Sequence, residues 1–208
     1  MKKKITKLSA EMDVDSNLSG LHVPGFNLGS YVLRRIRSDD AQVVFAGLSN
    51  PQVIAHYGVS YESLEATAEQ MRWYDWLLAE GAGIWWGIAR QEDGELIGAC
   101  GFNDWQHEHH RIDLGYWLLP EYWKQGIMQA ALSHILRYAF GHMGIHRVHA
   151  DVEPENAASL HLLKKLGFAH EGTLRDVEYK DGCYISLHQL SLIKTDPAAV
   201  ELIRSASG

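Results

Sequence analysis

The sequence predicts a mixed α/β (α+β) domain, with a central sheet of about seven strands flanked by helices. Three observations predict this class. A helical apolar spacing over 64–80 changes to a period of two over 84–105, strands and helices then alternate over 112–166, and a hairpin follows over 173–192. This order places helices on the faces of a mixed sheet. We expect one domain over 28–195, between a flexible N-terminal arm (1–27) and a C-terminal tail (196–208).

The first elements follow from local patterns. Residues 1–27 mix charges, Ser, Gly, Asn and Pro without a sustained period, which favours a loosely held arm. The alternation "YVLRRI" predicts a strand, and Ser38 with two aspartates provides helix N-terminal chemistry for "AQVVFAGL". The segment 64–80 predicts a helix, with Ser63 as its N-cap and Gly81 just beyond its end.

Two strands and a turn come next. The stretch "IWWGIARQEDGELIGACGFNDW" predicts a hairpin that turns at "EDGE", because Asp-Gly tolerates positive φ. A further turn, "QHEHHR", leads into the strand "IDLGYWLL".

The second half alternates more regularly. A helix that begins near Gly126 carries apolar rows at a spacing of four, which predict a wide buried stripe against the sheet: Ile127, Ala131 and Ile135, and Met128, Leu132, Leu136 and Phe140. The strand "HRVHADV" and the helix "NAASLHLLKKL", closed by Gly167, follow. The chain ends with a hairpin that turns at Asp181 and Gly182, and one short helix in the tail.

Composition narrows the functional classes. The 208 residues carry a formal net charge of −7, which argues against a phosphate-reading nucleic-acid surface and leans toward a cationic partner. Cys100 and Cys183 form no CxxC, suit a reducing compartment, and are expected to be inert core thiols. Without a signal-peptide apolar region or an apolar run of membrane length, we expect a cytoplasmic protein with no membrane partner.

One glycine separates a strand from a helix in "YWKQGIMQAAL". Amides at the start of a helix lack intrahelical partners and the helix dipole favours an anion there, so the segment from Lys124 to Gln129 is a candidate phosphate site. Gly126 would let a phosphate approach the backbone closely. The segment is neither a P-loop nor a GxGxxG turn, and Gly126 as a simple turn residue remains an alternative.

A second motif supports the anion site. The segment "NAASLHLLKKLGF" (156–168) fits NxxSxxLxxKxGF, and together with "GYWLLPEYWKQG" it resembles the GNAT acetyltransferases, in particular the RimJ/RimL type that acetylates N-terminal amines. The resemblance covers about residues 28–192. It implies a GNAT-like single domain with a splayed strand at the site of acetyl-CoA.

The resemblance also implies cofactor contacts. The pantetheine arm would lie beside Trp117, Leu118 and Leu119, and Asn156 would hydrogen-bond that arm. Lys124 or Lys165 would lie near the phosphates, and the pyrophosphate would meet the loop residues Lys124, Gln125, Gly126, Ile127, Met128 and Gln129. The usual loop, Q/RxxGxG/A, is altered here, because Trp123 replaces its polar first residue and Met128 its small last one.

Acetyl transfer needs a neutral amine and a proton for the departing thiolate. The tyrosine that usually supplies this proton is replaced by Leu163. Ser159 resembles the serine proposed as acid in the RimL branch and would also border the cofactor; a capping or packing role remains an alternative. Glu178 resembles the proposed base, with an exposed strand position as its alternative. Glu171 is the second candidate, and a water chain is the third.

A period of two places Asp176, Glu178 and Lys180 on one strand face, with Val177 and Tyr179 opposite. If Val177 and Tyr179 supply the packed side, the Glu178 face borders either the cleft or solvent, and both alternatives remain open. Tyr116, Asn103 and Asp104 are candidates for the acceptor pocket. No metal site is expected: "HEHH" is not HExxH, has no Cys nearby, and lies in a turn. The tryptophans favour core or pocket lining: Trp73, Trp76, Trp85, Trp86 and Trp105.

The predicted function is direct transfer of the acetyl group of acetyl-CoA to a primary amine. The resemblance suggests a protein N-terminal α-amine, with a ribosomal protein as acceptor. Two alternatives remain open: a small-molecule amine such as an antibiotic, a polyamine or an amino acid, and a non-catalytic acyl-CoA sensor or scaffold. Either a monomer or a homodimer is compatible with the sequence, and no direct nucleic-acid partner is expected.

Overall fold

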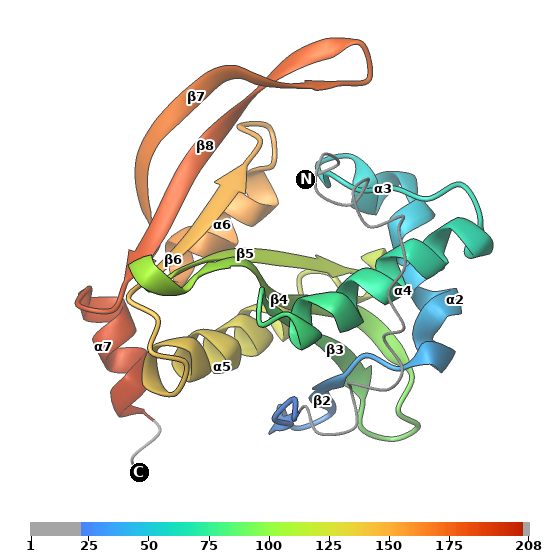
Figure 1. Ribbon diagram of the computed structural model, residues 1–208, viewed down its shortest axis with the longest axis horizontal. Coiled ribbons are helices and arrows are strands. Elements are labelled where there is room, and N and C mark those ends of the chain that lie inside the picture. The colour runs from blue at the N-terminus through green and yellow to red at the C-terminus, as the bar shows by residue number, and fades with distance from the viewer. Residues whose placement is uncertain (1–21, 206–208) are drawn as a thin grey trace. The chain divides into compact units, whose positions relative to one another are not determined.

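The computed structural model describes residues 22–205 and contains a mixed sheet of eight strands in the order β1-β2-β3-β4-β5-β6-β8-β7 (Figure 1). The predicted fold class is therefore confirmed, with one strand more than the seven expected. The chain forms two compact units. One holds the described residues up to Asp104 together with Gly115–Ala131, and the other holds Trp105–Leu114 and the residues from Leu132 onward. Strand β5 and helix α5 contribute residues to both.

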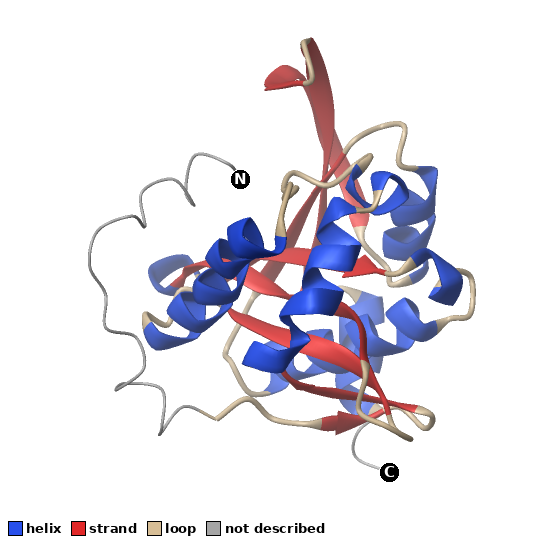
Figure 2. Cartoon of the chain, turned by 90° about the vertical axis from the view of Figure 1, so that its right-hand side faces the viewer, coloured by secondary structure: helices blue, strands red, loops and turns tan. Residues whose placement is uncertain are grey.

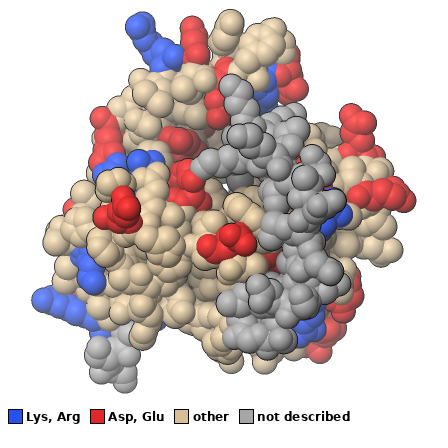
Figure 3. Space-filling view, in the orientation of Figure 1, with Lys and Arg blue, Asp and Glu red and all other residues tan. Residues whose placement is uncertain are grey.

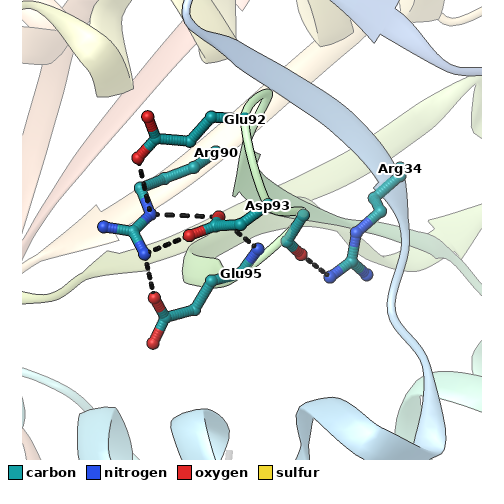
Figure 4. Close-up of polar contacts among 6 residues, drawn as sticks. Arg34, Arg90, Glu92, Asp93 and Glu95 are labelled. Atoms are coloured by element: carbon teal, nitrogen blue, oxygen red, sulfur yellow. Dashed lines mark hydrogen bonds and ion pairs between the residues drawn. The ribbon is translucent and has the colours of Figure 1, made fainter.

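Antiparallel strands form the sheet of the first unit. They are β1 (Phe26–Asn27), β2 (Tyr31–Arg35), β3 (Ile84–Arg90) and β4 (Leu96–Gln106), paired in that order. The predicted turn between β3 and β4 is confirmed, with Gly94 at φ +75°. Figure 4 shows how the turn is held, because the Arg90 guanidinium contacts the carboxylates of Glu92, Asp93 and Glu95.

The end of the predicted arm is ordered. Strand β1 pairs with β2, and the indole N–H of Trp86 donates to Pro24 O at 2.8 Å. The expectation of a loose arm is thus wrong for Phe26–Asn27, because two strand residues were too few to show a period. Residues 1–21 of that arm lie outside the described residues.

Among the described residues, the helices that lie wholly in the first unit are α2 (Ala41–Ser49), α3 (Pro51–Ile54) and α4 (Leu64–Ala79). Ser63 is the predicted N-cap of α4, since its hydroxyl accepts from Ala66 N–H at 3.1 Å. Helix α4 packs against α2 and β3 (Figure 2). The short helix α3 was not predicted, although Asn50 and Pro51 provide its cap and its first turn.

In the second unit, β5 (Arg111–Leu118) pairs in parallel with β6 (Arg147–Val152). Strand β8 (Cys183–Ile193) then joins β6 antiparallel, and β7 (Ala169–Lys180) lies at the edge. Both predicted apolar rows of α5 (Ile127–Gly141) are confirmed, since no member is more than 9% exposed.

Helices α6 (Ala157–Lys165) and α7 (Pro197–Arg204) complete the second unit. The guanidinium of Arg137 in α5 donates to Leu202 O at 2.8 Å. A Cβ added to Gly167 would lie 2.2 Å from Ala198 Cβ, so only glycine permits this approach of α7. The predicted tail helix is therefore confirmed, and it packs onto the unit. Within residues 22–205, no helix has the length and apolar character that a membrane crossing requires.

The outer part of the β7–β8 hairpin, residues 174–187, is here named the distal ribbon (Figure 1). The pairing of β7 with β8 shifts between Leu174 and Glu178, and Asp176 has φ +52°. Most of the large apolar side chains that are exposed in the described chain lie here, namely Leu174, Val177, Tyr179 and Tyr184.

Candidate active site

The predicted phosphate loop lies in the first unit, between the end of β5 and the start of α5. Lys124 has φ +59° and Gly126 φ +78°, so two left-handed residues turn the chain into the helix. A Cβ added to Gly126 would meet no atom within 4 Å, which leaves the backbone open to a bulky group.

The first turn of α5 offers hydrogen-bond donors. Its first i to i−4 bond joins Ala130 N–H to Gly126 O at 3.0 Å, so the amides of Ile127 and Met128 fall outside the i to i−4 pattern. The helix dipole adds partial positive charge at this end. A pyrophosphate such as that of acetyl-CoA fits these donors and this open backbone.

The unusual Trp123 has a structural role in the loop. Its indole N–H donates to Leu118 O at 2.7 Å, and Gln125 Nε2 donates to Glu121 O at 2.8 Å. Both bonds hold the loop to the segment at the end of β5. The second departure from the family pattern, Met128, is buried at 9% exposure, so its side chain packs into the protein.

The end of β5 is rigidly packed. Trp117 is buried, its indole N–H lies 3.3 Å from Tyr74 Oη, and a Cβ on Gly47 would lie 2.3 Å from its ring. Leu119 N–H donates to Ile97 O at 2.9 Å. Because the Leu119 N–H and the Leu118 carbonyl are both used within the protein, the expected pairing with pantetheine stays a prediction for the other backbone groups of residues 117–119.

Two buried polar atoms lie next to Gly115 in the middle of β5. A Cβ on this glycine would lie 2.8 Å from the Trp85 ring and 3.6 Å from Asn103 Oδ1. Trp85 Nε1 and Asn103 Oδ1 are both buried with no hydrogen-bond partner among the residues that the structure describes. Asn103 was predicted as an acceptor-pocket residue and Trp85 as core or pocket lining, and the glycine inside the strand "IDLGYWLL" is a sequence signal of this close approach.

The other pocket candidates lie on the same two strands. Asp104, at the end of β4, has φ +57°, and Tyr116 on β5 is half-buried. An aspartate in the left-handed region is uncommon, which marks a locally unusual backbone beside Asn103.

The motif asparagine and serine begin α6 in the second unit. Asn156 Oδ1 accepts from Ser159 N–H at 3.1 Å, which is an N-cap bond. The cap uses the amide oxygen and leaves the Asn156 NH₂ group as the donor toward a ligand. Leu163, at the position of the usual tyrosine, is fully buried, and Lys165 is exposed in the last turn.

Glu178 is exposed on the distal ribbon. The predicted alternation is kept over Glu178–Lys180, which pair with β8 in regular register, and the register shift before Glu178 leaves Asp176 outside it. Val177 and Tyr179, expected on the packed side, are 45% and 67% exposed. The shift opens a groove of about 630 Å³ lined by Thr173, Leu174, Arg175, Asp176, Val177 and Ser186.

Glu171, the second base candidate, is held by one guanidinium group and one hydroxyl group. Arg147 Nη1 donates to Glu171 Oε1 at 2.8 Å, with a second contact between the two groups, and Ser191 Oγ donates at 2.7 Å. These hydrogen bonds lower the pKa of Glu171 to about 2. A carboxylate this acidic is a poor proton acceptor near neutral pH.

The histidines of the turn after β4 and the tryptophans were also singled out in the sequence. His107 stacks on Trp105 with ring centroids 4.2 Å apart, and no group of three His, Cys, Asp or Glu in the described chain could hold a metal ion. The core interpretation is confirmed for Trp73, Trp85 and Trp86, while Trp76 and Trp105 are half-buried.

The two cysteines differ. Cys100 is buried, and burial raises the pKa of its thiol, as expected of an inert core residue. Cys183 is exposed at the distal ribbon, so the core expectation is wrong there.

Comparison with known proteins gives the family. The acetyltransferase (GNAT) domain family matches residues 31–169. Uncharacterized N-acetyltransferase YoaA of Bacillus subtilis (strain 168) is 37% identical over 164 residues, 78% of this chain and 93% of that protein. The [ribosomal protein uS5]-alanine N-acetyltransferase of Escherichia coli (strain K12) is 33% identical over 104 residues, 50% and 54% of the two chains.

A solved structure shares the fold. Spermidine N-acetyltransferase from Vibrio cholerae, in complex with CoA and spermine, superposes with a TM-score of 0.71 at 20% identity, covering 80% of this chain and 96% of that one. The chain thus belongs to the GNAT acetyltransferases and is an acetyl-CoA-dependent acyltransferase.

Proposed function

We propose that the acceptor is the α-amine of a protein N-terminus, acetylated directly from acetyl-CoA. The similarity to the uS5-alanine N-acetyltransferase carries this proposal, because that relative acts on a ribosomal protein and exceeds the spermidine enzyme in identity. A cytoplasmic location agrees with such an acceptor and with two cysteines far apart in the sequence.

The proposed binding roles follow the two units. In the first, the amides at the start of α5 and the Lys124 side chain bind the pyrophosphate, and the backbone of Trp117 and Leu118 binds the pantetheine arm. In the second, Asn156 donates to that arm through its amide nitrogen, and Lys165 supplies positive charge for the phosphates.

The proposed chemistry uses Ser159 and Glu178. The amine attacks the thioester carbonyl carbon, the C–S bond breaks, and Ser159 gives the thiolate its proton. Glu178 accepts a proton from the acceptor ammonium.

Charge favours a cationic acceptor. On the distal ribbon, Lys180 Nζ lies 2.7 Å from Glu153 Oε1, so its charge is balanced by a carboxylate outside the ribbon. The charges that remain on the ribbon are the single cation of Arg175 and the three carboxylates of Asp176, Glu178 and Asp181. On the face that Figure 3 draws, acidic side chains are spread over the surface and basic ones lie in small separate groups. Such a surface attracts an ammonium group.

A panel of acceptors tests the proposal. Thiol release from acetyl-CoA is measured with peptides that have free or blocked N-termini, and with spermidine. The proposal predicts turnover of free N-termini only. Turnover of spermidine with no peptide activity would assign the site to polyamines, and tight acetyl-CoA binding without turnover of any amine would favour the sensor alternative.

A further inference from the structure

The distal ribbon has little packing of its own. It extends beyond β6 and α6 as a pair of strands (Figure 1). All residues of β7 except Gly172 and Lys180 are exposed, so both faces of this strand meet solvent over most of its length. The register shift between Leu174 and Glu178 also interrupts its pairing with β8. Because a two-stranded ribbon is marginally stable by itself, a fixed position of this one requires a contact with the rest of the second unit.

Lys180 makes such a contact. Its Nζ lies 2.7 Å from Glu153 Oε1, and the side chains of the two residues are 23% and 12% exposed. An ion pair that is fully exposed contributes little, but this pair is largely removed from water, where the loss of one partner leaves an uncompensated charge. The pair therefore holds the outer end of β7 against the segment that follows β6.

That segment leads directly into α6. Asn156 N–H donates to Glu153 O at 2.9 Å, and Asn156 Oδ1 accepts from Ser159 N–H at 3.1 Å. The backbone of Glu153 thus belongs to the turn that starts the helix, while its side chain reaches the ribbon. Through Glu153, the ribbon is joined to the two residues that the proposed function assigns to the cofactor arm and to the leaving thiolate.

The same strand carries the proposed base. Glu178, Tyr179 and Lys180 pair with β8 in regular register. Because side chains alternate along a strand at about 3.3 Å per residue, the Glu178 carboxylate and the Lys180 ammonium lie on one face, with their Cα atoms about 7 Å apart. The contact between Lys180 and Glu153 turns this face toward the start of α6. Glu178 itself is exposed, so its carboxylate is accessible to an acceptor.

The position of a general base decides whether it acts. The base must lie within hydrogen-bond reach of the proton that it accepts, and a misplacement of about 1 Å can lower a rate by about 10². A ribbon that is exposed on both faces does not keep a carboxylate in one place without an anchor. Because Lys180 is only two residues from Glu178, an anchor there restricts the carboxylate more than one at the start of β7 would.

We propose that Lys180 and Glu153 are positioning residues that hold the Glu178 carboxylate at the acceptor amine. The proposal rests on the proposed function, in which Glu178 takes the proton of the acceptor ammonium. Neither residue of the pair touches the reacting atoms in this arrangement. The Glu153 carboxylate also neutralises the Lys180 ammonium, which would otherwise attract the Glu178 carboxylate and make it a weaker base.

Two single variants and a matched control test the pair. Lys180→Met keeps the length of the side chain and removes its charge, and Glu153→Gln keeps the shape of its partner. Lys194→Met is the control, because Lys194 is an exposed lysine directly after β8 in the same unit. The kcat/KM for a peptide with a free N-terminus and the acetyl-CoA Kd are measured for each folded protein.

We expect both single variants to lower kcat/KM about tenfold, mainly through kcat, and the control to leave it unchanged. The acetyl-CoA Kd should not change, because the backbone carbonyl of residue 153 still accepts from Asn156 N–H. An independent readout is hydrogen exchange of the amides of 174–187, which should lose protection in both variants and keep it in the control.

A double-mutant cycle separates positioning from general stability. In the Glu178→Gln protein the base is already absent, so the addition of Lys180→Met should cause no further loss of kcat/KM. A pair that only stabilises the fold would instead give the same fold-loss in both backgrounds, and that result would overturn the proposal.

Three other results would also overturn it. Wild-type kcat/KM in folded Lys180→Met, or an acetyl-CoA Kd that rises in parallel with the loss, would remove the positioning role and leave peptide acetylation standing. Wild-type kinetics of Glu178→Gln would remove the base and the positioning role together, again with peptide turnover intact. A wild type that turns over no free peptide would instead overturn the proposed acceptor, and the positioning role with it.

Discussion

At the scale of single residues, one hydrogen bond between Ser159 and Asn156 caps the start of α6. The N-cap bond from Ser159 N–H to Asn156 Oδ1 fixes the start of α6 with backbone atoms of the serine. The Ser159 hydroxyl is not needed for this cap. Its chemistry can therefore be tested without removing the helix start.

Ser159→Ala should lower kcat by roughly 10² if the hydroxyl protonates the leaving thiolate, and should leave the acetyl-CoA Kd nearly unchanged. Single-turnover kinetics and a binding titration make the comparison. Ser49→Ala, in α2 of the first unit, is the control hydroxyl deletion, because the Ser49 hydroxyl donates only to Phe45 O of its own helix among the bonds described. A parallel loss of binding in Ser159→Ala would assign the serine to the cofactor instead.

The pH dependence of kcat/KM tests the proposed role of Glu178 as a base. Glu178→Gln keeps the shape of the side chain and loses proton acceptance, so the low-pH limb of kcat/KM should flatten and activity should partly return as pH rises. The measurement is the pH dependence of kcat/KM on a peptide acceptor. An unchanged rate and profile would make Glu178 a surface residue, and the base would then be Glu171 or a water chain.

Glu171 has a stabilising rather than a catalytic part in this account. Its pKa falls from the usual 4.5 to about 2 in the folded chain, because Arg147 and Ser191 hydrogen-bond the ionised form. The resulting stability is fully present above about pH 4.5 and is lost as pH falls toward 2.

As pH falls between these values, the Tm should therefore decline less steeply for Glu171→Gln than for the wild type. Added salt should reduce this difference between the two proteins. The Glu171 side chain is 39% exposed, so salt screens its ion pair with Arg147. Identical slopes for the two proteins would mean that the ion pair with Arg147 does not form in solution.

At the scale of elements, the sequence predicted what rests on local periodicity. The stripe of α5, the Ser63 cap and the Asp-Gly turn depend on residues a few positions apart, and the structure confirms all three. The register shift in β7 could not be predicted, because it depends on how β8 pairs across a long hairpin. The ion pair between Lys180 and Glu153 joins residues 27 positions apart and was missed for the same reason.

The loop before α5 gives the element-scale prediction. Gly126→Val should raise the acetyl-CoA Kd about tenfold or more, equal to about 1.4 kcal/mol, because the side chain occupies open space before the helix amides. Gly144→Val is the matched control. Gly144 has φ +70° and open surroundings, so valine adds similar backbone strain away from the loop.

Both variants should lower the Tm, and only Gly126→Val should weaken binding of acetyl-CoA in an isothermal titration. Equal binding by the two folded variants would remove the loop from the cofactor site.

At the scale of the whole molecule, fold and family were predictable because two motifs in the correct order, "GYWLLPEYWKQG" and "NAASLHLLKKLGF", resemble one family. The acceptor was not predictable to the same degree. The relatives include one named for a ribosomal protein and one named for spermidine, and the two motifs, which carry the family resemblance, do not distinguish between these acceptors.

The most direct measurement is mass spectrometry of an alanine-initiated peptide after incubation with the protein and acetyl-CoA, beside the same peptide with a blocked N-terminus. The account predicts one acetyl group on the α-amine of the free peptide, a matching amount of released CoA thiol, and no product from the blocked peptide. Acetylation of spermidine with an untouched free peptide would contradict it.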